Sequence, residues 1–115
     1  MAGNVLISAV RLTRPINLII ILATMVGVYF YLNKCNPTLA VNTIYFSLLA
    51  ISTVLIAAGG NIINDYYDLK ADQINKPNKV ILSKNISKEL GLKIYIVLNS
   101  LSLSLGFYLS FILDT

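Results

Sequence analysis

Acidic and amide side chains gather at the end of one long uncharged stretch of the chain. The group consists of Asn61, Asn64, Asp65, Asp68 and Asp72. At about 100° of rotation per residue, a helix would carry Asn61 and the three aspartates on one narrow face, with Asn64 at its border. Carboxylates three or four residues apart on a helix repel each other by about 0.2–0.5 kcal/mol per pair. A positively charged group is therefore expected beside this face.

Oxygen ligands of this kind suit a hard divalent cation. Mg²⁺ is commonly held by one or two carboxylates, while phosphate oxygens and waters complete its octahedron. The sequence has no histidine, and its single cysteine, Cys35, cannot form an internal disulfide. We therefore predict a Mg²⁺–diphosphate site at the acidic cluster. The alternative is a solvated polar helix end, because runs of charge usually face water.

The rest of the composition is typical of a membrane protein. Hydrophobic residues make up 57% of the sequence and charged residues only 12%, and the mean hydropathy is +0.75. A soluble domain needs far more charge on its surface. Uncharged intervals long enough for the ~20 residues that cross a bilayer predict spanning helices over 15–32, 42–63 and 94–113. Only helices satisfy their own backbone in lipid, so the expected fold is an all-α transmembrane bundle.

The polar ends of these helices extend beyond the membrane. The second helix is expected to continue to about residue 73, since nothing interrupts its polar face before Pro77. Ser87, followed by Glu89, is typical of an N-cap with an acid in the first turn, so the third helix is expected over 88–113. The connection 74–87 is long enough to fold over the acidic cluster. We expect residues 1–115 to form one helical unit.

Basic residues predict the orientation. The second connection and its flanks hold six lysines, whereas the first connection has only Lys34; the six are Lys70, Lys76, Lys79, Lys84, Lys88 and Lys93. Because cationic loops stay inside, the amino terminus and the acidic cluster should be cytoplasmic, in the inner (plasma) membrane of the cell. The first apolar run lacks a small-residue cleavage pattern, which favours a retained helix over a signal peptide. The net charge of +4 suits anionic lipid headgroups, and no motif indicates nucleic acid.

Two motifs together resemble the UbiA superfamily of intramembrane prenyltransferases. Residues 14–17 (RPIN) stand at the start of the first span, and residues 64–72 (NDYYDLKAD) are followed by 74–77 (INKP). The second motif is similar to the first aspartate-rich region of that family. The resemblance implies transfer of an isoprenyl group from its diphosphate to a lipid or aromatic acceptor, with Mg²⁺ bridging the aspartates and the diphosphate.

The resemblance also implies roles for individual residues. Asn64, Asp68 and Asp72 would be the catalytic residues that contact the metal and the diphosphate, and Asp65 would join Asp68 and Asp72 as a metal ligand. Substrate-binding roles would belong to Arg14, Asn17, Asn61 and Lys79. Residues 79–82 (KVIL) replace the Arg-Pro-Leu-type stretch of many members, and a lysine keeps the charge but not the bidentate fork for phosphate.

The resemblance covers only part of such an enzyme. The family has about nine helices and a second aspartate-rich region on a later helix, so these residues correspond to its first third. We therefore expect residues 1–115 alone to be an incomplete, inactive fragment. Leu69 after Asp68, together with 74–77, is more similar to enzymes that add geranylgeranyl to geranylgeranylglyceryl phosphate, or to chlorophyll synthases, than to 4-hydroxybenzoate or haem O enzymes. We favour the ether-lipid type.

Two other classes of function also explain the carboxylates. One is a small non-catalytic membrane subunit that binds a cation or a lipid headgroup, and the other is a transporter fragment whose acidic face is an ion site. Neither requires the observed register of amides and aspartates. A transporter would also place its ions nearer the middle of the bilayer than the mouth of a helix.

Overall fold

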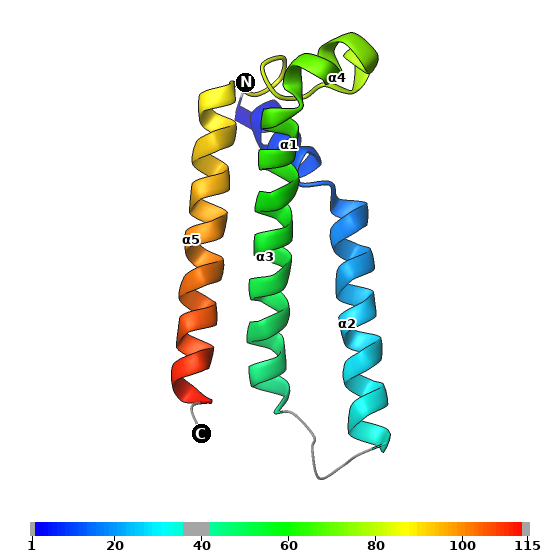
Figure 1. Cartoon of the computed structure of the whole chain (residues 1–115), viewed down its shortest axis with the longest axis vertical. Coiled ribbons are helices and arrows are strands. Elements are labelled where there is room, and N and C mark those ends of the chain that lie inside the picture. The colour runs from blue at the N-terminus through cyan, green and yellow to red at the C-terminus, as the bar shows by residue number, and fades with distance from the viewer. Residues whose placement is uncertain (1, 36–41, 114–115) are drawn as a thin grey trace.

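The computed structural model describes residues 2–35 and 42–113 of the chain, and these residues form helices joined by short connections. The elements are α1 (Ala2–Leu12), α2 (Pro15–Cys35), α3 (Thr43–Tyr67), α4 (Leu69–Asn75), the 3-10 turn η2 (Pro77–Lys79) and α5 (Lys88–Ile112). The long helices α2, α3 and α5 run beside one another, and α1 and α4 lie across one end of them (Figure 1). The predicted all-α fold is confirmed.

Three helices within the described ranges are long and apolar enough to cross a membrane, as predicted: α2, α3 and α5. Pro15 is the first residue of α2, where its fixed φ suits the helix and its missing N–H needs no partner. The side chain of Asn42 accepts a hydrogen bond from the N–H of Ile44 (2.8 Å) at the start of α3. Ser87 accepts one from the N–H of Leu90 (3.1 Å), which confirms the predicted N-cap of α5.

The prediction of one continuous helix over 42–73 is wrong. α3 ends at Tyr67, and α4 begins at Leu69 after a bend at Asp68, whose φ of −89° and ψ of 6° leave the helical region. The N–H of Asp68 still donates to the carbonyl of Asn64 (3.0 Å), and its own carbonyl accepts from Asp72 (2.8 Å). Tyrosine and aspartate are weak helix formers, and aspartate favours helix ends. The bend takes place where Leu69 enters a buried cluster.

The sequence did not reveal α1. This helix is joined to α2 through Thr13 and Arg14, whose N–H groups donate to the carbonyls of Val10 (3.2 Å) and Arg11 (3.1 Å). Arg14 has a φ of 56°, a left-handed backbone conformation that is uncommon for a residue with a side chain. The turn lets a short helix across the membrane edge lead directly into a spanning one.

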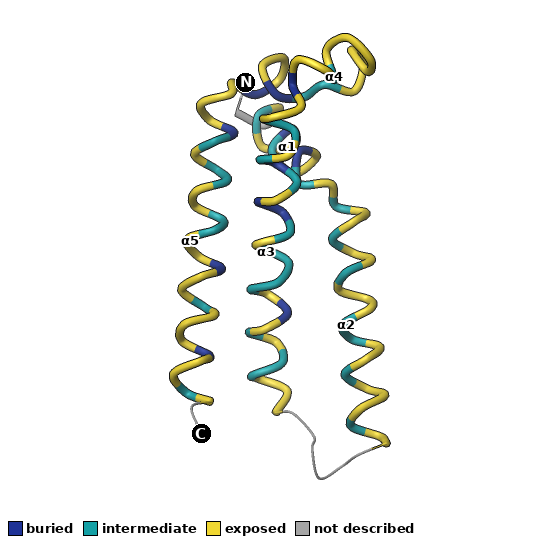
Figure 2. The backbone as a smooth tube through the Cα atoms, in the orientation of Figure 1, coloured by how far each residue is buried: buried dark blue, intermediate teal, exposed yellow. Residues whose placement is uncertain are grey.

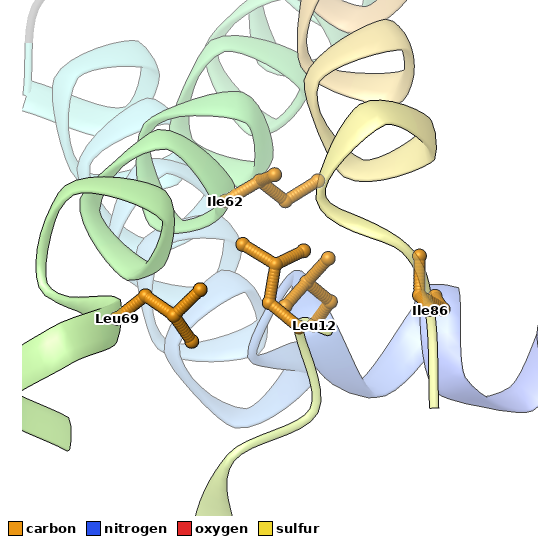
Figure 3. Close-up of a cluster of buried hydrophobic side chains, with 5 residues drawn as sticks. Leu12, Ile62, Leu69 and Ile86 are labelled. Carbon is orange, nitrogen blue, oxygen red and sulfur yellow. The ribbon is translucent and has the colours of Figure 1, made fainter. Parts of the chain in front are cut away.

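A buried hydrophobic cluster ties this end of the molecule together. It contains Leu12 from α1, Ile62 from α3, Leu69 from α4, and Leu82 and Ile86 from the connection to α5. Figure 3 shows four of these side chains converging from their separate elements. By contrast, most residues along the spanning helices are exposed, and α2 has none that is buried (Figure 2). The tightest packing therefore lies at the membrane edge.

Small and hydroxyl residues bring α3 and α5 together inside the span. The hydroxyl of Ser102 donates to the carbonyl of Ser52 (2.7 Å), and the hydroxyl of Ser52 donates to the carbonyl of Ser102 (3.0 Å). A Cβ at Gly59 would come within 3.1 Å of the Asn99 side-chain oxygen, whereas one at Gly60 would meet nothing within 4 Å. Such contacts are typical of helix association in lipid. Ser52 and Ser102 thus link the two helices by hydrogen bonds.

The two glycines of α3 provide a matched test of this interface. We expect Gly59→Leu to destabilise the chain in detergent by about 1–3 kcal/mol, because the added atoms must displace α5. Gly60→Leu has room for its side chain and removes an entropic cost of glycine in a helix, so it should be neutral or stabilising. Thermal unfolding followed by circular dichroism compares the two. Equal effects of both substitutions would show that α3 and α5 are not packed through Gly59.

Candidate functional site

A pocket of ≈ 290 Å³ lies at the membrane edge, where α1, the α3–α4 bend and the connection to α5 meet. Its charged lining residues are Arg11, Arg14, Lys76, Lys79, Asp65 and Asp72. Its apolar lining residues are Leu69, Val80, Ile81 and Leu82. Since Leu69 and Leu82 belong to the buried cluster, the apolar wall of the pocket is part of the packed core.

An ion pair holds two of the predicted residues in place. Nη2 of Arg14 lies 2.5 Å from Oδ1 of Asp65, with side chains that are 43% and 22% exposed. This pair joins the start of α2 to the end of α3. It is the one salt bridge among residues 2–35 and 42–113. Arg14 therefore reaches the predicted site, but its charge is already shared with Asp65.

The pocket gathers four of the predicted site residues: Arg14, Asp65, Asp72 and Lys79. Asn17, Asn64 and Asp68 are exposed and do not line it. The amide of Asn61 donates to the carbonyl of Thr13 (2.8 Å), so it fixes the α1–α2 turn against α3. The roles assigned to these residues stay predictions.

The three aspartates do not form a ready-made metal centre. In the described part of the chain, no three histidine, cysteine, aspartate or glutamate side chains are grouped closely enough to hold a metal ion. Asp65 lies on α3, Asp68 at the bend and Asp72 on α4. Mg²⁺ needs only one or two carboxylates when phosphate oxygens and waters supply the rest. The donor set therefore suits a metal that arrives with a diphosphate, and the ligand assignment stays a prediction.

Two cationic lining residues were not assigned from the sequence. Arg11 is in the last turn of α1, and Lys76 is the C-cap of α4, where its N–H donates to the carbonyl of Asp72 (2.7 Å). Lys76 stands four residues after Asp72, a helical spacing that could have been noticed. Arg11 could not have been placed without α1.

The connection 76–87 covers one side of the pocket. Hydrogen bonds within its backbone and the burial of two apolar side chains hold it in this position. The N–H groups of Lys84 (3.2 Å), Asn85 (2.8 Å) and Ile86 (3.2 Å) all donate to the carbonyl of Ile81. Leu82 is 1% exposed and Ile86 is 3% exposed. Anchored in this way, the connection brings Lys79 to the pocket. Four cations and two carboxylates beside an apolar wall can bind a phosphorylated group attached to a hydrocarbon chain.

Comparison with known proteins finds related sequences. The profile described as the UbiA prenyltransferase family matches residues 20–113. The digeranylgeranylglyceryl phosphate synthase of Korarchaeum cryptofilum is 37% identical over 107 residues, which are 90% of this chain and 34% of that protein. Its namesake from Methanothermobacter thermautotrophicus is 31% identical over 102 residues, 87% of this chain and 33% of that protein. No solved structure matches the chain.

A third namesake, from Saccharolobus solfataricus, is 43% identical over 65 residues, which are 53% of this chain and 23% of that protein. The chain spans about a third of the length of the first two relatives. The family profile nevertheless covers most of the chain, including nearly all of the three spanning helices and the whole acidic segment. The chain is an integral membrane protein and belongs to the UbiA prenyltransferase family.

Proposed function

We propose that the protein transfers a geranylgeranyl group from its diphosphate to geranylgeranylglyceryl phosphate in a Mg²⁺-dependent reaction. The observation that carries the proposal is the pocket at the membrane edge, where carboxylates and cations lie beside an apolar wall. The names of the relatives, digeranylgeranylglyceryl phosphate synthases, support this acceptor. Transfer to an aromatic acceptor would follow the same chemistry.

In the proposed mechanism, Asp68 and Asp72 would hold Mg²⁺, and Asn64 would contact the metal and the diphosphate. When bound, the ion supplies positive charge that stabilises the departing diphosphate. Lys79, which lines the pocket, would donate hydrogen bonds to the diphosphate oxygens. Asp65 would be a further metal ligand, and Arg14, its ion-pair partner in this structure, would bind the diphosphate.

The apolar surfaces at the site would bind the prenyl chain of the substrate. The apolar wall and the exposed apolar surfaces of the spanning helices bind the prenyl chain and exclude water from the carbon that becomes electron-poor. The acceptor hydroxyl oxygen forms a bond to that carbon, and the bond between the same carbon and the diphosphate oxygen breaks. The electron pair of the broken bond leaves with the diphosphate, and the hydroxyl proton is released. Asn17 is exposed near the start of α2 and does not line the pocket; its proposed role is to contact the substrate outside the pocket.

The charges of the pocket disfavour the two non-enzymatic alternatives. A subunit or transporter that binds a free cation needs an excess of carboxylate oxygens at its site. The pocket instead contains more cationic side chains than acidic ones. Its composition favours an anionic ligand that brings a metal ion with it.

We further propose that this end of the molecule lies on the cytoplasmic side of the plasma membrane. The six lysines between residues 70 and 93 all lie at or near the pocket end of the helices, and cationic segments stay inside. Cys35, at the opposite end of α2, would then lie outside.

Replacing the proposed metal ligands tests the reaction. In membranes that contain the product of the intact gene, we expect Asp68→Asn or Asp72→Asn to lower kcat/KM for labelled geranylgeranyl diphosphate by about 100-fold or more, because a charge partner of the metal is lost. The Mg²⁺ concentration for half-maximal rate should rise as well. Glu89→Gln removes an exposed carboxylate of α5 and serves as the control. Wild-type rates in Asp72→Asn would contradict the assignment.

Cys35, the single cysteine of these 115 residues, tests the orientation. Cys35 is exposed, so a membrane-impermeant maleimide added to intact cells should label it. A second protein, with Cys35→Ser and Lys84→Cys, should be labelled only after the cells are opened. The reverse pattern would place the pocket on the outer side and overturn the cytoplasmic assignment.

A further inference from the structure

Arg11 and Lys76 are the two charged pocket residues that the proposed reaction leaves without a role. They come from different elements, the end of α1 and the end of α4, and both line the pocket. Neither forms an ion pair with any residue in the ranges 2–35 and 42–113. Like charges that share a pocket repel each other. Because both line the same pocket, they favour an anionic ligand there.

The remaining charges of the pocket are already matched. Asp65 pairs with Arg14, and the proposed mechanism assigns Asp72 to the metal and Lys79 to the diphosphate. The two positive charges of Arg11 and Lys76 are not balanced in this way. A phosphate monoester carries a charge of about −1.5 to −2 near neutral pH. The negative charge of such a group therefore balances the two positive charges of Arg11 and Lys76.

The chemistry of a glyceryl ether acceptor requires a second phosphate site here. Such an acceptor carries its phosphate and its reacting hydroxyl on the same three-carbon unit. When the hydroxyl attacks the prenyl carbon, the acceptor phosphate must lie close to the departing diphosphate. Two phosphorylated groups at this separation repel unless cations lie beside them.

We infer that Arg11 and Lys76 bind the phosphate monoester of the acceptor lipid; this inference rests on the proposed function. The planar guanidinium of Arg11 can donate two parallel hydrogen bonds to the phosphate, and Lys76 adds a compact charge. The apolar wall, which includes Leu69 and Leu82, would contact the glyceryl and ether carbons of the acceptor. Holding the phosphate fixes the neighbouring hydroxyl, so the two residues position the acceptor for attack.

A different explanation is that these cations only attract anionic headgroups of the bulk lipid or set the orientation of the chain. In that case their replacement would have the same effect as replacing any exposed lysine nearby. Lys70 on α4 and Lys84 in the connection are exposed and do not line the pocket. Both provide controls that remove one positive charge from the same region.

Steady-state kinetics of the intact gene product in membranes separates these explanations. We expect Arg11→Gln and Lys76→Gln each to raise the KM for geranylgeranylglyceryl phosphate by about tenfold, as the loss of one charged hydrogen-bond donor implies. The KM for geranylgeranyl diphosphate should change much less. Arg11→Lys should recover part of the loss, while Lys70→Gln and Lys84→Gln should leave both KM values unchanged.

A dephosphorylated acceptor tests the contact itself. The wild-type protein should prefer the phosphorylated lipid over the corresponding glyceryl ether alcohol, and the double variant Arg11→Gln, Lys76→Gln should lose most of that preference. If the variants instead raise the KM for geranylgeranyl diphosphate, these residues serve the donor and the inference is wrong while the proposed function stands. If the wild type transfers only to acceptors without phosphate, the proposed function itself fails.

A binding measurement decides the question without turnover. Calorimetry with a short-chain glyceryl ether phosphate and the purified protein in nanodiscs should show about tenfold weaker binding for the double variant than for the wild type. Inorganic phosphate at equal concentration should bind more weakly than the ether phosphate to the wild type, because it lacks carbons to contact the apolar wall. Equal affinity of wild type and double variant for the ether phosphate would overturn the inference.

Discussion

The burial of a few branched side chains at the membrane edge is the constraint on which the rest of this structure depends. Leu12, Ile62 and Leu69 come from three different helices, and Leu82 and Ile86 come from the connection to α5. All five side chains are buried together in one cluster. Inside the bilayer the surrounding lipid is as apolar as the side chains, so the same driving force is weak there. The molecule is accordingly best packed outside its spans.

This arrangement explains how a pocket rich in charge can be well defined. The apolar wall belongs to the packed cluster, and the charged residues stand on segments that the cluster holds: α1, the end of α3, α4 and the connection after it. Long basic side chains would otherwise be mobile at a membrane surface. Here their backbones are fixed, so cations and carboxylates from separate elements remain within reach of one ligand.

The sequence predicted the parts of the fold that depend on local pattern. Uncharged intervals gave the spans, and Asn64 to Asp72 carried enough of a family motif to indicate the site. The bend at Asp68 and the helix ending at Leu12 could not be predicted from local sequence. Both are stabilised by contacts within a cluster whose members are distant in the chain. For the same reason no site role was predicted for Arg11, although one was predicted for Arg14, three residues later.

Arg14 illustrates how local geometry and charge are linked in this molecule. Its left-handed backbone sets the angle between α1 and α2, while its guanidinium neutralises Asp65. Glycine or asparagine would accept the backbone more readily but would leave the carboxylate unopposed. Because one residue serves as both hinge and counter-ion, any tilt of α2 that rotates this hinge also draws the guanidinium off the carboxylate. The inclination of the first membrane helix is thereby coupled mechanically to the electrostatic potential of the pocket.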